Sequence, residues 1–142
     1  MALPFLFQNM IHLIPNNGTN DVYVTPFEAR KFLAAFSYYL MVLENVSTRE
    51  TFPLILNFDI DNERYTHAEM PTNNDDPVNG EILLTESGLY TYKIYGQTSD
   101  ANLDPTDASV VGLCEMGSCK VSDEPAWTIP NVTIPDNVIY YE

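Results

Sequence analysis

The chain has 142 residues and a net charge of −14, from 20 acidic against 6 basic side chains. So acidic a surface repels phosphate backbones and anionic lipid headgroups, which disfavours nucleic-acid and membrane partners. The length suits one domain, and 45% of the residues are apolar, enough for folding by burial.

Residues 1–14 are apolar, but we expect neither a signal peptide nor a membrane span there. The first basic residue is Arg30, so a basic leader region is lacking, and no small-residue cleavage site follows. The segment is also too short to cross a bilayer, and Pro4 and Gln8 interrupt it. We expect residues 1–20 to form a first strand or an ordered arm.

Strands and one helical segment are predicted between residues 21 and 70. The expected strands are 21–25, 37–44, 51–60 and 64–70, which are rich in β-branched and aromatic residues. In the strand at 51–60, apolar residues alternate from Phe52 to Ile60, and Pro53 favours a sheet edge. The capping box Thr25-Pro-Phe-Glu28 predicts two helical turns at 29–36, with a hairpin as the alternative.

Turn signals separate further strands between residues 71 and 122. Pro, Asn, Asp and Gly predict a loop at 71–80, and a polar loop is expected at 96–107. The expected strands are 81–85, 89–95, 108–114 and 119–121, and the last two are predicted to form a hairpin about Gly117. That hairpin would set Cys114 opposite Cys119. We expect two reduced cysteines that fill a sheet face, with a disulfide as the alternative.

The C-terminal segment, residues 123–142, carries a small repeat. Its three five-residue units each open on Pro and close on Ile. Proline at this spacing is incompatible with a helix or a central strand, so the segment is predicted to be extended. It suits docking on another surface, and an irregular last edge strand is the equal alternative. The candidate partner-binding residues are Trp127, Ile129, Ile134, Ile139 and Tyr140.

The most specific local motif is Glu86-Ser-Gly-Leu-Tyr-Thr-Tyr92, which matches the tyrosine corner before strand F of immunoglobulin-like domains. Gly88 would permit a positive φ at the turn. Tyr90 would bury its ring and bond its hydroxyl to the backbone of the preceding connection. Tyr92 stands where immunoglobulins have a cysteine, and it is expected to face the core together with Tyr90 and Ile94.

These elements predict an all-β domain, an immunoglobulin-like antiparallel β-sandwich of about seven to nine strands with extended terminal arms. The sandwich is expected to span residues 21–122. The arms are expected at 1–20 and 123–142.

The sequence holds no phosphate-binding loop and no nucleophile elbow, so we expect neither an enzyme nor a cofactor. A pairing of His67 with Cys114 is the weakest candidate for chemistry, and His12 stands in a different context. Asp59 and Asp61 are expected to share one face of a strand as solvated carboxylates.

Two acidic loops are more credible candidates for a functional site, because their carboxylates could bind calcium. Neither loop has EF-hand spacing, and we expect no metal site. Their residues are Asp75, Asp76 and Glu81 in one loop, and Asp100, Asp104 and Asp107 in the other.

Several stretches, taken in order over residues 37–142, carry a resemblance to a known family. They are Tyr38-Tyr-Leu40, Glu63-Arg-Tyr65, Gly88 to Ser99 with Asn102-Leu-Asp-Pro105, Val110 to Val121, and Val138-Ile-Tyr-Tyr-Glu142. Together they resemble small immunoglobulin-like virion proteins of tailed bacteriophages, including crAss-like phages that infect Bacteroidota. The segment 25–36 and the Pro–Ile repeat depart from that pattern.

The resemblance implies a capsid auxiliary or decoration protein on the outside of a phage head, made in the bacterial host cytoplasm. Its partners would be the major capsid protein and neighbouring virion subunits, with multiple copies per particle. The alternative is a head-fibre or tail/connector component that binds glycans through exposed aromatics such as Trp127 and Tyr95. A small secreted hydrolase or inhibitor is a third hypothesis, with no positive support in the sequence.

Overall fold

A computed structural model describes residues 10–122 of the chain. The predictions for residues 1–9, for the C-terminal segment and for Trp127, Ile129, Ile134, Ile139 and Tyr140 lie outside the described residues. The strands of the described part are β1 (Met10–Leu13), β2 (Asp21–Val24), β3 (Tyr38–Asn45), β4 (Thr51–Ile55), β5 (Phe58–Asp61), β6 (Thr66–Glu69), β7 (Asn73–Asp76), β8 (Glu81–Leu83), β9 (Gly88–Gln97) and β10 (Val110–Val121). Two short 3-10 helices, η2 (Pro26–Lys31) and η3 (Pro77–Asn79), lie between strands.

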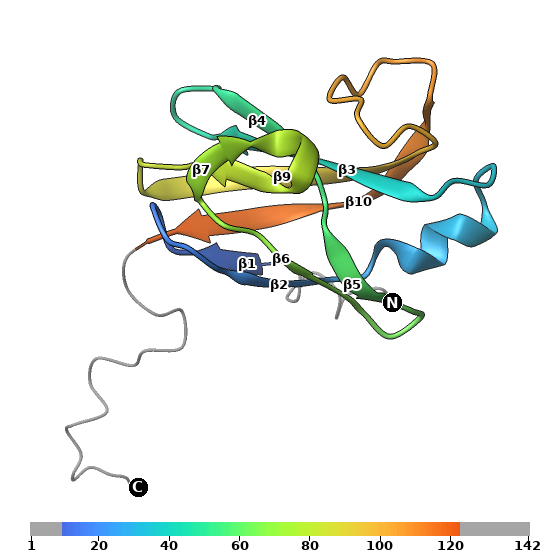
Figure 1. Ribbon diagram of the computed structural model, residues 1–142, viewed down its shortest axis with the longest axis horizontal. Helices are drawn as coiled ribbons and strands as arrows, with labels where there is room; N and C mark the ends of the chain where they lie inside the picture. The colour runs from blue at the N-terminus through green and yellow to red at the C-terminus, as the bar shows by residue number, and fades with distance from the viewer. Residues whose placement is uncertain (1–9, 123–142) are drawn as a thin grey trace, which may run out of the picture.

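The strands form two stacked layers and a small ribbon (Figure 1). One sheet has five strands in the order β1-β10-β9-β3-β4, and the other has three in the order β2-β6-β5. The ribbon pairs β7 with β8. Neighbouring strands are antiparallel except β1, which runs parallel to β10 and so departs from the purely antiparallel prediction. The predicted all-β sandwich is confirmed.

The core lies between the two sheets and follows from the alternation of side chains along each strand. On β9, Tyr90, Tyr92 and Ile94 are almost completely buried, whereas Leu89 is 51% exposed, so the predicted inward set is correct. The three-stranded sheet adds Val22 and other buried apolar side chains to the same cluster. Burial of each large apolar side chain contributes roughly 1.5–3 kcal/mol.

The prediction of one strand at 51–60 is wrong, because the chain changes sheets in the middle of that stretch. β4 ends at Ile55, the backbone N–H of Leu56 bonds the carbonyl of Tyr39 at 2.9 Å, and β5 begins at Phe58 in the other sheet. Phe52 and Leu54 of β4, Leu56 at the crossing and Phe58 of β5 all pack on the same core, so the alternation continues across the crossing as far as Phe58. The register shift that follows leaves Ile60 exposed. The predicted edge position of Pro53 is confirmed, since β4 is an outer strand of the five-stranded sheet.

The hairpin predicted about Gly117 is also wrong. β10 is one continuous strand from Val110 to Val121, and Gly117 pairs directly with Tyr92 of β9. Both predicted halves find the same partner, because β9 is long enough to pair with the whole strand. Two register shifts, beside Val111 and Cys114, are β-bulges that let β10 follow the twist of the sheet.

The helix predicted at 29–36 is replaced by η2, which ends at Lys31 and has no side-chain cap. Thr25 bonds the carboxylate of Glu115 with its backbone N–H at 2.7 Å. After η2 the chain packs against the five-stranded sheet, where Phe36 lies over Gly96 and Leu33 lies over Gly112.

The stretch 71–80, predicted to be a loop, contains β7 and η3 as well. Its asparagine and aspartate side chains are mostly exposed, so β7 shows no apolar alternation that the sequence could have revealed. β7 pairs with β8 through Asn73 with Leu83 and Asp76 with Glu81. The ribbon and η3 together form a wall beside β4.

Candidate functional site

The tyrosine corner predicted at Glu86, Gly88 and Tyr90 has the expected geometry. The hydroxyl of Tyr90 donates a hydrogen bond of 3.0 Å to the carbonyl oxygen of Glu86, and its ring is buried. Gly88 has a φ of +140°, a conformation that side chains other than glycine rarely adopt. The bond fixes how the chain turns from β8 into β9.

Replacing Tyr90 with phenylalanine is expected to cost about 1 kcal/mol, because the carbonyl of Glu86 loses its buried donor while the ring packing is kept. Thermal and urea unfolding measure this loss. Tyr23→Phe is the matched control, since Tyr23 is 62% exposed and should tolerate the change. An unchanged melting temperature in Tyr90→Phe would show that the corner adds nothing to stability.

Tyr92 links the two sheets through Glu115. Its hydroxyl donates a 2.6 Å hydrogen bond to one carboxylate oxygen of Glu115. The other oxygen accepts from the backbone N–H of Thr25, which follows β2 in the opposite sheet. Burial and the neighbouring Glu115 carboxylate raise the pKa of Tyr92 well above its ordinary value. The role of Glu115 is not visible in the sequence, because the predicted hairpin placed this residue in a turn.

A second polar network joins the sheets around Asp61. Its carboxylate accepts hydrogen bonds from Arg30 at 3.2 Å, from Thr66 at 2.6 Å and from the hydroxyl of Tyr39 at 3.1 Å. The Asp61 side chain is only 10% exposed and Tyr39 is fully buried. The Arg30 guanidinium also bonds the carbonyl of Phe36 at 2.6 Å and lies 4.3 Å from the centre of that ring. Burial raises the pKa of Tyr39, so its phenol keeps its proton.

Asp59 and Asp61 were expected on one face as solvated carboxylates. Asp59 is solvated, with its side chain 68% exposed, but the shared face and the solvation of Asp61 are wrong. A register shift between Phe58 and Ile60 turns Asp59 outward while Asp61 reaches the polar network just described. Asp59 lies 2.7 Å from Nδ1 of His67, and Asp21 lies 2.9 Å from its Nε2. His67 on the middle strand thus connects to both outer strands of the three-stranded sheet.

The free energy of unfolding is expected to fall as pH rises through the pKa of His67. Hydrogen bonds with Asp21 and Asp59 raise that pKa above its ordinary 6.5. The stabilisation is therefore complete below about pH 6.5, the pKa in the unfolded chain, and is lost as pH rises through the higher pKa of the folded protein. Asp59, whose bond with His67 lowers its pKa below 3.8, loses its share only at more acidic pH. Urea unfolding from about pH 5 to about pH 9 should show this slope. A His67→Gln variant with the same slope would contradict the assignment.

The outward side of the five-stranded sheet, called the outer face below, combines apolar and basic side chains. β9 and β10 present cross-strand pairs there: Tyr95 with Leu113, Lys93 with Met116, Thr91 with Ser118, and Leu89 with Lys120. Met116 is 56% exposed and Leu113 is 44% exposed. Because the chain has only 6 basic residues, the two lysines make this face the least acidic part of β9 and β10.

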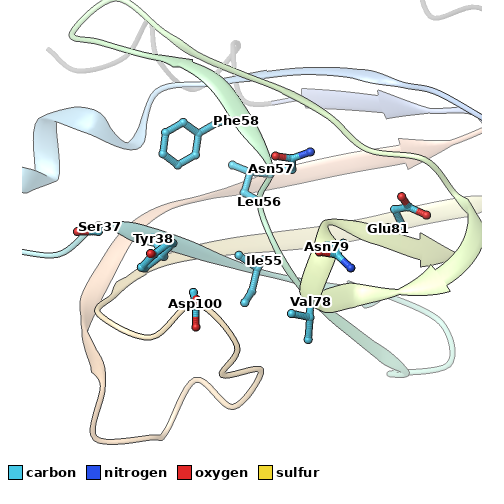
Figure 2. Close-up of a pocket in the computed structure, with 10 residues that line it drawn as sticks. All are labelled: Ser37, Tyr38, Ile55, Leu56, Asn57, Phe58, Val78, Asn79, Glu81 and Asp100. Carbon is cyan, nitrogen blue, oxygen red and sulfur yellow. The ribbon is translucent and has the colours of Figure 1, made fainter.

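A cleft of about 590 Å³, called the edge cleft below, opens where β4 crosses to β5 (Figure 2). Figure 2 shows Tyr38 and Asp100 on one side, Val78 and Asn79 on the other, and Ile55 between them. The remaining lining residues are Ser37, Leu56, Asn57, Phe58 and Glu81. The lining thus combines two aromatic rings, aliphatic side chains, amides and carboxylates, and includes no Lys, Arg or His. The cleft could not be predicted from the sequence, because its walls come from four separate segments.

Both cysteines are free thiols, as predicted for reduced side chains on a sheet face. Cys119 is fully buried in the core and burial raises its pKa to about 12, while burial raises the pKa of Cys114 to about 11. The structure does not bring Cys114 to His67, because Cys114 packs against the core from β10 and His67 faces outward between two aspartates.

The acidic loops use several carboxylates for their own turns. Asp104 accepts from the backbone N–H of Thr106 at 2.9 Å, and Asp107 accepts from that of Ser109 at 3.0 Å. Within residues 10–122, no group of three or more His, Cys, Asp or Glu side chains is arranged to hold a metal ion. The same residues contain no helix both long and apolar enough to cross a membrane.

No family model, no curated protein and no solved structure matches the chain.

Proposed function

We propose that this chain is a structural, non-enzymatic virion protein, an immunoglobulin-like module that decorates the outside of a phage head. It would bind the major capsid protein and neighbouring subunits in multiple copies and reinforce capsomer contacts. Anything that binds only the assembled shell stabilises that shell by mass action. Many copies on one particle make individually weak contacts sufficient.

The strand order supports the immunoglobulin-like part of the proposal. Immunoglobulin domains pair strands B, E and D in one sheet and strands G, F and C in the other, with C′ added in variable-type domains. The sheets β2-β6-β5 and β10-β9-β3-β4 follow this order along the chain, and the tyrosine corner lies at the start of β9. The virion assignment itself rests on the resemblance of the sequence motifs.

The outer face is the observation that carries the contact role. Leu89, Leu113 and Met116 are each more than two-fifths exposed on neighbouring strands, with Lys93 and Lys120 between them. Exposed apolar side chains gathered on one face are typical of protein–protein contact sites. Two lysines on a protein of net charge −14 favour an acidic or neutral partner surface.

A Met116→Glu variant tests the contact role of the outer face. We expect it to fold normally and to be lost from particles, because the new carboxylate would be desolvated in the interface beside apolar neighbours. Ile60→Glu is the matched control, since Ile60 is 37% exposed on the other sheet. Both are measured by quantitative mass spectrometry of purified particles. Equal incorporation of the two variants would contradict the assignment of the outer face.

The C-terminal segment is proposed as a second docking element. Deleting residues 125–142 should leave a soluble product that no longer enters particles. Normal incorporation of this truncation would refute the docking role of the segment while leaving the outer-face proposal standing.

A head-fibre or tail/connector component is the second candidate, and the edge cleft favours it. Its aromatic and amide lining is of the kind that sugar-binding sites use. Copy number separates the two positions, because decoration requires many more copies per head than a fibre or connector does.

A further inference from the structure

The edge cleft has walls that other contacts hold in place. On one side Gly80, at a φ of +84°, lies so close to the crossing chain that an added Cβ would stand 2.9 Å from the Cβ of Asn57. On the other side, buried Gln97 receives a 2.9 Å hydrogen bond from Asn102 and donates one of 3.0 Å to its carbonyl. This exchange holds the loop that carries Asp100. Because both walls are preformed, a ligand would lose little free energy to ordering them.

The cleft also presents polar groups that the described residues leave open. The side chains of Ser37, Asn57 and Asp100 accept or donate no hydrogen bond among residues 10–122. Asn79 uses its amide nitrogen on Asp76, and Glu81 uses one oxygen on Asn74, which leaves one oxygen of each unpaired. The open groups include hydroxyl and amide donors as well as carboxylate and amide acceptors. A ligand with many hydroxyl groups would pair with this mixture.

Aromatic rings supply the apolar part of the cleft. Tyr38 is 36% exposed at the mouth, and Phe58 is held by an edge-to-face contact with Tyr39, with ring centres 5.4 Å apart. The ring of Phe58, held in this way, offers flat apolar area that would lose little conformational entropy on binding a ligand. The carboxylates of Glu81 and Asp100, with no basic side chain in the lining, disfavour any anionic ligand.

We propose that the edge cleft binds a neutral saccharide. A pyranose ring packs its C–H face on Tyr38, and its hydroxyl groups bond Asn57, Asp100 and Glu81. The volume of about 590 Å³ lies within the range of small-molecule sites. This inference does not depend on the position of the protein in a virion, and it is tested on the isolated chain, so it fails independently of the decoration proposal.

The test is an NMR titration of the isotope-labelled full chain with neutral disaccharides, namely maltose, cellobiose, lactose and chitobiose. At least one should bind at millimolar concentration and shift the amide signals of Asn57, Asn79 and Asp100. Tyr38→Ala and Asp100→Asn should each weaken that binding about tenfold, as loss of a stacked ring or a hydrogen bond to a charged group does. Tyr23→Ala, an exposed tyrosine on the other sheet, should bind as the natural chain does.

Two results would overturn the proposal. The first is no binding of any of the four sugars, or binding that Tyr38→Ala and Asp100→Asn leave unchanged. The second is that trilysine binds the cleft while the sugars do not, which would make the site a receptor for cationic side chains. Unfolding midpoints of all variants, measured alongside, ensure that a loss of binding reports on the cleft and not on the fold.

Discussion

Replacing Asp61 with alanine is expected to cost about 3 kcal/mol of folding free energy, because it removes the charged acceptor of several part-buried hydrogen bonds. The variant leaves the Arg30 guanidinium without its carboxylate and the hydroxyls of Tyr39 and Thr66 without their acceptor. These donors come from η2, β3 and β6, so the loss loosens the contact between both sheets. For a domain of this size, such a cost removes a large part of total stability.

Arg49→Ala is the control for this prediction. The ion pair of Arg49 with Glu44 has a similar length of 3.3 Å, but its side chains are 76% and 35% exposed. Exposed pairs contribute about 0–1 kcal/mol, so the control should unfold almost as the natural chain does. Urea unfolding of both variants gives the comparison. If Asp61→Ala lost no more than Arg49→Ala, the network would not hold the sheets together.

Gly96→Ala is expected to cost about 2 kcal/mol, because there is no room for a methyl group at this position. A Cβ on Gly96 would lie 2.6 Å from the ring of Phe36, which is itself buried and stacks edge-on against Tyr39. The ring can move only by giving up that contact and the position of the Arg30 guanidinium, 4.3 Å from its centre. The expected loss exceeds the small gain from reduced freedom of the unfolded chain.

Gly18→Ala serves as the matched control, since an added Cβ there meets only an Asn73 nitrogen at 3.7 Å. Differential scanning calorimetry of the two variants measures the difference. We expect a clear drop in melting temperature for Gly96→Ala and almost none for Gly18→Ala. Equal melting temperatures would mean that the Phe36 ring does not pack tightly against Gly96.

The strands that bury one face were predictable from sequence, and β9 is the clearest case. Its alternation places Tyr90, Tyr92 and Ile94 in the core, and the corner motif before it predicts the bond to Glu86. Both signals are local, because side-chain period and turn geometry depend on neighbouring residues. The same local logic failed between Leu54 and Phe58, where a change of sheet leaves the alternation intact.

The polar bridges and the edge cleft could not be read from the sequence, because long-range register creates them. Glu115 meets Tyr92 through the pairing of β10 with β9, where Glu115 lies opposite Ile94, the next inward residue after Tyr92. Arg30 and Asp61 are likewise far apart in sequence. With 20 acidic residues in the chain, the sequence does not indicate which of them pairs with Arg30. The cleft needs Gly80 to seat η3 against the crossing chain.

The central claim is that this chain is a structural component of phage particles, and quantitative mass spectrometry of purified particles tests it most directly. We expect the chain in a fixed, high ratio to the major capsid protein, unchanged by washing the particles at high salt. Absence of the chain from purified particles whose other structural proteins are all present would contradict the claim.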